Sequence, residues 1–223
     1  IENENKIISG FGTGLVAPTE EEIEMAIQGD FFRLLKDYVP RDTELPYTVD
    51  NSTSKYFPPI GNQGAKGACV SFSFVYYTGT FYSARDNNWD LSSVTWDNGY
   101  TGSPSAKTKV LSPQFIFHQL NKANEKNGSS YIRNLYAFLY AGCSTWETTP
   151  YDCYDYSEWP SGLAWREAPL YRQDQGDTYW MEVNTDEEIE ILKQLLNDGY
   201  LISISIDADK YDVLTDDDLW TVD

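Results

Sequence analysis

Apolar residues recur at helical spacing in several stretches of the chain, and each such stretch predicts an amphipathic helix. A further stretch, residues 69–84, has no charged side chain and carries aromatic residues on every face, which predicts a buried central helix. Residues 200–208, YLISISIDA, alternate apolar and polar positions, as a β-strand does. The predicted amphipathic helices cover residues 19–38, 113–126, 131–140 and 186–197.

Helix boundary signals divide the chain further. Thr19 and Glu22 form a predicted capping box, and Pro40 ends the helix that begins there. Gly29 weakens the middle of this helix, which can divide in two at that point. Gly142 predicts the end of the helix that precedes it. Loops are predicted for residues 45–68, 85–110 and 150–180.

The charge balance restricts the partners. The chain has 223 residues with 35 acidic and 16 basic side chains, a net charge of −19. A nucleic acid or an anionic membrane surface is therefore disfavoured as a partner, because both require a high density of Lys and Arg. No apolar stretch reaches the roughly 20 residues of a membrane span. The opening IENENKIISG lacks a signal peptide, and we expect an exported protein, secreted or at the cell surface, whose signal peptide has been removed.

Cysteine usage leaves two arrangements open. The three cysteines are Cys69, Cys143 and Cys153, so at least one thiol lies outside any disulfide. Either Cys143 pairs with Cys153 and Cys69 stays reduced, or all three are reduced. A cysteine count alone does not fix the redox compartment.

Cys69 begins the predicted central helix, directly after the glycine-rich segment GNQGAKGA. Unpaired N–H groups and the dipole at a helix N-terminus favour a thiolate there. Gln63, six residues earlier, can turn its amide toward the point that the Cys69 N–H faces, and two such donors form an oxyanion hole for acyl transfer. Gly64 and Gly67 allow a tight loop and the close approach of a substrate. The alternative is a buried cysteine that packs as a small apolar residue.

The segment NQGAKGACVSF resembles the active-site stretch of papain-like cysteine peptidases, NQG-x-C-G-S-C-W-A-F. Other segments resemble the same family in the same order: LPYTVD its mature N-terminus, LSPQF a helix start, residues 127–151 the run from the substrate groove to a TxPY turn, and residues 198–208 the first strand of the β subdomain. The resemblance covers about residues 45–223. Six residues fall in register with the motif: Asn62, Gln63, Gly64, Gly67, Cys69 and Phe72.

This resemblance implies an α+β fold of two subdomains, a helical left one and a β-barrel-like right one that is incomplete in this chain. It also implies cleavage of peptide or protein substrates through a thioester acyl-enzyme, with no metal or organic cofactor. Cys69 would be the nucleophile and Gln63 the oxyanion donor. Gly128 and Ser129 would present their backbone to an extended peptide, which would pair with them as an added strand does. Ser130 and Tyr131 would lie near the pocket for the second residue before the scissile bond. The implied substrate-binding residues are Gly67, Gly128, Ser129, Ser130 and Tyr131.

The chain departs from the family motif at three positions. Lys66 replaces the family's cysteine three residues before the nucleophile, so the disulfide that closes this loop is absent. Val70 stands where the family has tryptophan, which changes the packing under the helix. Ser129 replaces one glycine of the groove pair, where its side chain is expected to crowd or reshape the subsite.

A cysteine nucleophile of this kind needs an imidazole to accept its proton. The chain has one histidine, His118, on a helix that the family does not use for catalysis, and we interpret it as structural. The family's catalytic His and Asn follow the strand that residues 198–208 resemble. They would then lie on a second chain, or be absent because the chain is truncated or is an inert relative. We favour the second chain, because half a β subdomain would expose apolar strand edges.

The resemblance divides the chain into an N-terminal arm, residues 1–44, and a peptidase domain, residues 45–223. The arm has no core of its own and must dock on the domain. One interpretation is an inhibitory propeptide whose helix docks on the domain while FGTGLVAP runs through the groove, and the other is a structural extension. The rival to a peptidase is a non-catalytic peptide-binding or cell-surface module on the same fold.

Overall fold

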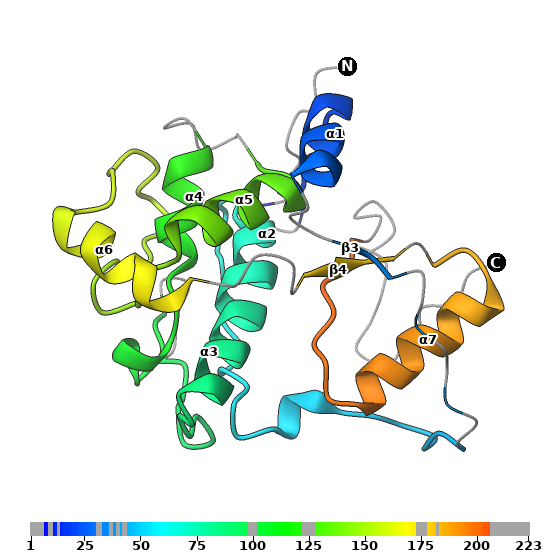
Figure 1. Ribbon diagram of the computed structural model, residues 1–223. Helices are drawn as coiled ribbons and strands as arrows, with labels where there is room; N and C mark the ends of the chain where they lie inside the picture. Colours follow the sequence, from blue (N-terminus) through cyan, green and yellow to red (C-terminus); the bar gives the residue numbers. More distant parts are fainter. Residues whose placement is uncertain are drawn as a thin grey trace.

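The structure is a computed structural model, and its helices surround one long central helix (Figure 1). Helices α4, α5 and α6 lie on one side of the central helix, and α7 lies on the other. The N-terminal helix α1 lies beside α5, above the start of the central helix. The described residues are 7–8, 11–12, 14–29, 33–35, 38, 41, 44–97, 102–121, 128–172, 178–181 and 183–205.

The central helix confirms the prediction for residues 69–84 and is more irregular than the sequence indicates. It consists of α2 (Cys69–Ser71), a π-helix (Phe72–Gly79) and α3 (Thr80–Asp86). In the π-helical part the hydroxyl of Thr78 donates to the carbonyl of Ser73, five residues earlier, at 3.1 Å. Residues 69–84 of this helix carry no charge, and other elements pack on several of its sides.

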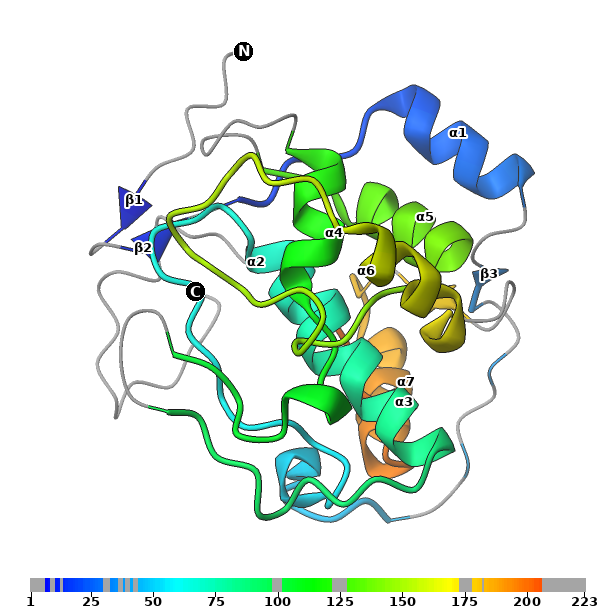
Figure 2. The same ribbon diagram turned by 90° about the vertical axis from the view of Figure 1, so that its left-hand side faces the viewer.

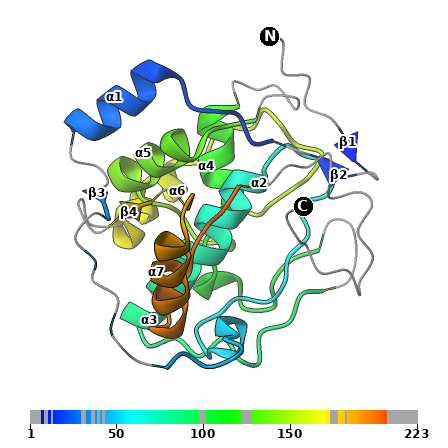
Figure 3. The same ribbon diagram turned by 90° about the vertical axis from the view of Figure 1, so that its right-hand side faces the viewer.

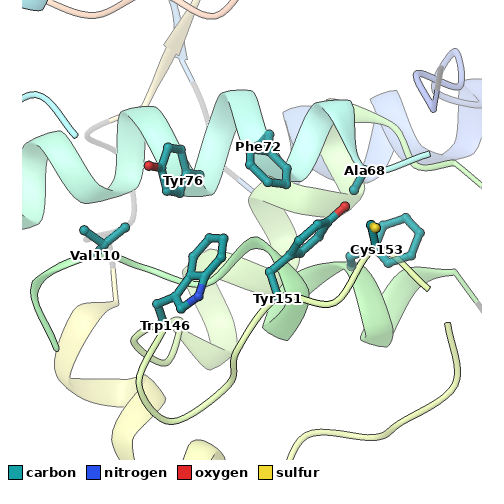
Figure 4. Packing of buried hydrophobic residues seen from close by; sticks show 8 residues of the cluster. Ala68, Phe72, Tyr76, Val110, Trp146, Tyr151 and Cys153 are labelled. Atoms are coloured by element: carbon teal, nitrogen blue, oxygen red, sulfur yellow. The ribbon is translucent and has the colours of Figure 1, made fainter. Parts of the chain in front are cut away.

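One face of the central helix packs into an aromatic cluster (Figure 4). Phe72 meets the ring of Tyr151 edge-on, with the centroids 4.9 Å apart, and Tyr76 meets Trp146 at 5.8 Å. Edge-to-face contacts of this kind add to the free energy gained from burying the rings. The cluster comprises Ala68, Phe72, Tyr76, Val110, Phe117, Trp146, Tyr151 and Cys153.

The opposite side of the helical half contains two predicted helices and one that was not predicted. Helices α4 (Pro113–Leu120) and α5 (Tyr131–Ala141) agree with prediction, although the predicted end of the first falls on residues outside the described set. Residues 150–180 were predicted to be loop, yet α6 (Gly162–Glu167) and a 3₁₀ helix (Ala168–Tyr171) form there.

Packing explains the unpredicted helix. The hydroxyl of Ser161 caps α6 by accepting from the N–H of Ala164 at 3.2 Å. Ala164 and Ala168 are fully buried in a second cluster that contains Cys143 and Phe138. Two alanines in an aromatic, proline-containing stretch are a weak sequence signal, so the helix owes its presence to tertiary contacts.

The N-terminal arm is helical over less of its length than predicted. Strands β1 (Ile7–Ile8) and β2 (Phe11–Gly12) pair antiparallel, and α1 spans Glu20–Gln28. Gly29 caps the end of α1, and β3 (Arg33–Leu34) follows, so the predicted helix does not continue toward residue 38. Strand β3 pairs in parallel with β4 (Tyr179–Trp180), and this pairing requires extended backbone where the helix was predicted.

The right-hand half is built around α7 (Asp186–Asn197), which agrees with prediction and lies in front of the central helix in Figure 3. Thr185 and Glu188 form a capping box at its start. The predicted strand 200–208 is not formed over residues 200–205, and its remainder lies outside the described residues. Instead the N–H of Leu201 bonds the hydroxyl of Tyr82 at 3.3 Å. The described part of the chain contains four strands of two residues each.

All three cysteines lie in the described part of the chain and form no disulfide, so of the two arrangements left open the structure has the one with three reduced thiols. Cys143 and Cys153 are fully buried in different clusters, which explains why they do not meet. Short 3₁₀ helices at Asn51–Thr53 and Lys107–Lys109 punctuate the predicted loops. Among the described helices, none has the length and apolar character needed to cross a bilayer.

Gly142 offers a test of the fold. Its φ is +77°, and a Cβ there would lie 1.9 Å from the carbonyl oxygen of Ala168. Gly142→Ala should therefore lower the free energy of unfolding by roughly 2 kcal/mol or more, measured by urea denaturation. The matched control is Gly162→Ala, where a Cβ meets nothing within 4 Å and little change is expected. Equal effects of the two substitutions would contradict the prediction.

Candidate active site

The loop before Cys69 is held by hydrogen bonds among its own residues. Gly64 has a φ of +64°, and its N–H bonds the side-chain oxygen of Asn62 at 2.8 Å. The side-chain amide of Gln63 donates to the carbonyl of Lys66 at 3.1 Å. The N–H of Ala68, the N-cap residue of the central helix, donates to the same carbonyl at 2.8 Å. The Lys66 carbonyl thus fixes both the Gln63 amide and the turn into Cys69.

The Cys69 thiol is half-buried and accepts a hydrogen bond from the N-terminal arm. The N–H of Gly14 lies 3.2 Å from its sulfur. Burial raises the pKa of the Cys69 thiol, and the N–H of Gly14 partly opposes this effect. With the arm in place the sulfur is therefore held as a neutral thiol at neutral pH.

The arm crosses the start of the central helix as an extended strand, seen from opposite sides in Figure 2 and Figure 3. Leu15 forms a parallel bridge with Ser129. The N–H of Ser129 donates to the carbonyl of Gly14 at 2.8 Å, and the N–H of Val16 donates to the carbonyl of Ser129 at 3.1 Å. An extended segment therefore pairs with the predicted groove residue, and it belongs to the chain itself.

Two glycines, Gly14 and Gly128, make this crossing sterically feasible. A Cβ on Gly14 would lie 1.8 Å from the carbonyl oxygen of Gly67, and a Cβ on Gly128 would lie 1.9 Å from that of Gly14. Both distances are far shorter than any real contact of a methyl carbon. Gly67 and Gly128, predicted to let a peptide backbone approach, therefore line the two sides of the arm.

Ser129 and its neighbours anchor the groove to the helices. The Ser129 hydroxyl accepts from the side-chain amide of Asn134 at 2.7 Å, and Ser71 of the central helix donates to the same side chain at 2.7 Å. Ser130 caps α5, and the Tyr131 hydroxyl donates to the carbonyl of Ile204 at 2.8 Å. The Ser129 side chain is thus buried against Asn134, a residue that sequence reasoning missed.

Arm docking depends on a second contact that the sequence did not suggest. Glu22, inside the capping box of α1, forms an ion pair with Arg133 of α5 and accepts from the hydroxyl of Ser130 at 3.4 Å. At the far end of the arm, the backbone of Arg41 exchanges hydrogen bonds with the side chain of Gln194 on α7 at 2.8 and 2.6 Å. The arm is therefore attached to both halves of the molecule.

His118 is buried and makes structural contacts, as predicted. Its Nδ1 bonds the carbonyl of Glu158, and its Nε2 lies 3.0 Å from the carbonyl of Asp155 and 3.4 Å from Nζ of Lys66. Burial lowers the pKa of His118, as does the nearby Lys66. Both ring nitrogens of His118 are thus bonded to main-chain carbonyls inside the protein.

Lys66 is fully buried, which the sequence gave no reason to expect. Its ammonium donates to the side-chain oxygen of Gln114 at 2.6 Å and to the carbonyl of Asp152 at 2.7 Å. Burial lowers the pKa of Lys66 to about 7, while Asp155 and Asp152 act in the opposite direction.

Comparisons with solved structures relate the fold of this chain to that of a cysteine protease. No protein-family profile matches the chain, and no curated protein matches it by sequence. The structure is similar to that of xylellain, a cysteine protease from Xylella fastidiosa, with a TM-score of 0.56 and 16% sequence identity. The match covers 85% of this chain and 64% of xylellain, so the chain spans less than two thirds of that protein. The chain has a papain-like fold.

In the papain-like fold of this chain, the predicted site residues fall into two groups. Cys69, Gly67, Gly128 and Ser129 meet around the arm, as described above. Gln63 lies on the loop leading to Cys69, with its amide oriented by the Lys66 carbonyl. The arrangement offers a thiol, a backbone edge for an extended peptide and an ordered amide. Within the described residues, no cluster of three or more His, Cys, Asp and Glu side chains could hold a metal ion.

The buried Lys66 makes stability depend on pH. Its pKa in the folded protein is about 7, below the ordinary value of 10.5, so between these values the unfolded chain binds more protons. Through this group the free energy of unfolding of the wild type therefore rises with pH, by up to about 1.4 kcal/mol per pH unit. Lys66→Met removes the contribution. Urea unfolding from pH 6 to 10 should show a wild-type-minus-variant difference that grows above pH 7, and a pH-independent difference would contradict this.

Proposed function

We propose that the chain is a latent papain-like cysteine peptidase in which residues 1–44 act as an inhibitory propeptide. The observation that carries the proposal is the hydrogen bond from the N–H of Gly14 to the Cys69 sulfur, made while the arm pairs with Ser129. The arm thereby occupies the edge that a peptide substrate would use. Its presence covers the thiol, and burial keeps the thiol pKa high.

In the active form, the Cys69 sulfur attacks the carbonyl carbon of the scissile peptide bond after losing its proton to an imidazole. The N–H of Cys69 and the amide of Gln63 stabilise the oxyanion that forms. The intermediate collapses to a thioester as the amine leaves with the proton from the imidazolium. Water then hydrolyses the thioester, which releases the acid and restores the thiol.

The imidazole must come from outside residues 1–223. His118 is the single histidine of the chain, and its ring is bonded to main-chain carbonyls in the Lys66 site. A second chain that completes the β subdomain would supply the catalytic His and Asn. Exposed apolar side chains around α7 support such a partner, because they would be covered by it. These residues are Tyr179, Val183, Ile189, Tyr200 and Ile204.

A second candidate function is a non-catalytic peptide-binding or surface module on the same fold. The commitment of His118 to structural contacts favours it, because no other imidazole exists in the chain. The two functions differ in the chemistry of Cys69. A module would bind a peptide through Gly128 and Ser129 without forming a bond to sulfur.

A peptidyl electrophile directed at thiols distinguishes these functions. In the complete protein, after cleavage between Arg41 and Glu44, Cys69 should react with it faster than free cysteine does at neutral pH. The reason is that the released groove aligns the peptide while an imidazole stabilises the thiolate. Intact-mass analysis and peptide mapping measure the adduct, and Cys69→Ser is the control. A rate equal to that of free cysteine would favour the binding module.

Latency can be tested at a single glycine. Gly14→Ala places a methyl group against Gly67 and should displace the arm from the groove. Alkylation of Cys69 by iodoacetamide should then be faster at pH 7, by roughly tenfold for each unit by which the thiol pKa falls. The control Gly162→Ala alters a site with open space around it. Unchanged alkylation in Gly14→Ala would count against an inhibitory arm.

A further inference from the structure

The side chain of Lys66 occupies a buried site in which oxygen acceptors and aromatic rings face its ammonium. Besides Gln114 and Asp152, its ammonium faces three aromatic rings. The distances from Nζ to the ring centroids are 4.7 Å for Tyr151, 5.0 Å for Phe117 and 5.5 Å for Tyr156. Oxygen acceptors and ring faces together replace part of the hydration that a buried ammonium loses.

The site draws on two distant parts of the chain. Gln114 and Phe117 belong to α4, while Tyr151, Asp152 and Tyr156 belong to the loop between α5 and α6. Lys66 therefore ties the loop before Cys69 to both of them. The family's disulfide is absent at this position, and a non-covalent attachment stands in its place.

Lys66 also holds the loop before Cys69, which carries Gln63, through its main-chain carbonyl. The Lys66 carbonyl accepts from the Gln63 amide at 3.1 Å and from the Ala68 N–H at 2.8 Å. Tyr151, whose ring lies under the ammonium, donates its hydroxyl to the carbonyl of Gln63 at 2.8 Å. Gln63 is thus fixed at its backbone by one member of the cation site and at its amide by another.

We propose that Lys66 is a positioning residue for the oxyanion hole: its ammonium, fixed by Gln114, Asp152 and the three rings, holds its own carbonyl where that carbonyl orients the amide of Gln63. This inference rests on the proposed peptidase function. A carboxamide nitrogen carries two hydrogens, so it can serve the Lys66 carbonyl and a substrate oxyanion together. Lys66 itself does not touch the substrate.

The charge of Lys66 makes the positioning dependent on pH. The titratable groups facing it are His118 on α4, and Tyr151, Asp152, Cys153, Asp155 and Tyr156 on the loop. Asp155 and Asp152 stabilise the ammonium, whereas burial favours the neutral amine. Loss of the proton at mildly alkaline pH weakens the contacts with the rings and with Gln114, which loosens the loop that carries Gln63.

The first measurement needs no catalysis. In the chain of residues 1–223, NMR spectra recorded from pH 6 to 9 should show the side-chain amide signals of Gln63 shifting with the same midpoint as the Cε signal of Lys66. In Lys66→Met the Gln63 signals should lose that titration, and in the control Lys55→Met they should keep it, since Lys55 is exposed and contacts Asn88. Gln63 signals that ignore the Lys66 titration in the wild type overturn the inference, even if the chain proves to be a peptidase.

The second measurement uses the complete, arm-cleaved enzyme. Lys66→Met should lower kcat for a peptide amide by about tenfold, with KM changed less than twofold, because the oxyanion exists only after attack. Alkylation of Cys69 by iodoacetamide, which forms no oxyanion, should keep its rate. An unchanged kcat, or an equal loss in both reactions, overturns the positioning role.

Two further outcomes remain interpretable. If Lys66→Met does not fold, the wild-type pH profile decides: kcat should fall on the alkaline side with the midpoint that NMR assigns to Lys66, and a different midpoint overturns the inference. If Cys69 never reacts with the peptidyl electrophile, the proposed function fails. The NMR titration then still shows whether Lys66 orients Gln63.

Discussion

The thiol of Cys69 sits where three backbone segments meet with no side chain between them, and the rest of the structure depends on that close approach. Gly14 of the arm lies in close contact with both Gly67 and Gly128. Gly67 directly precedes the start of the central helix, and Gly128 precedes α5, which Ser130 caps. The hydroxyl of Ser71 on the central helix donates to the side chain of Asn134 on α5 at 2.7 Å, which holds these two helices together.

Much of the helical half could be predicted from sequence, because its signals are local. The absence of charge over residues 69–84 and the helix-ending Gly142 each act within a few residues. Helix α6 and the parallel pairing of β3 with β4 could not be predicted, since both depend on partners far away in the sequence. The strand expected at residues 200–208 failed over its described part for the same reason: alternation of apolar residues needs a neighbouring strand to act on.

The candidate site shows the same division. Cys69, Gln63 and the glycines follow from a short motif, whereas Lys66 looks in sequence like an ordinary surface lysine. The chain has a net charge of −19 and 16 basic side chains, and one of these, Lys66, is fully buried. Only the folded arrangement of Gln114, Asp152 and the aromatic rings explains this, because none of them is near Lys66 in the sequence.

The carboxylate of Glu22 takes part in two structures at once. It completes the cap of α1 by accepting from the N–H of Thr19 at 3.1 Å, and it holds Arg133 and Ser130 on the groove side. If α1 leaves α5, the Glu22 carboxylate loses its ion pair with Arg133. If α1 unwinds, Glu22 no longer has the position from which it contacts Arg133. The ordering of α1 and its attachment to α5 are therefore coupled, because one carboxylate serves both.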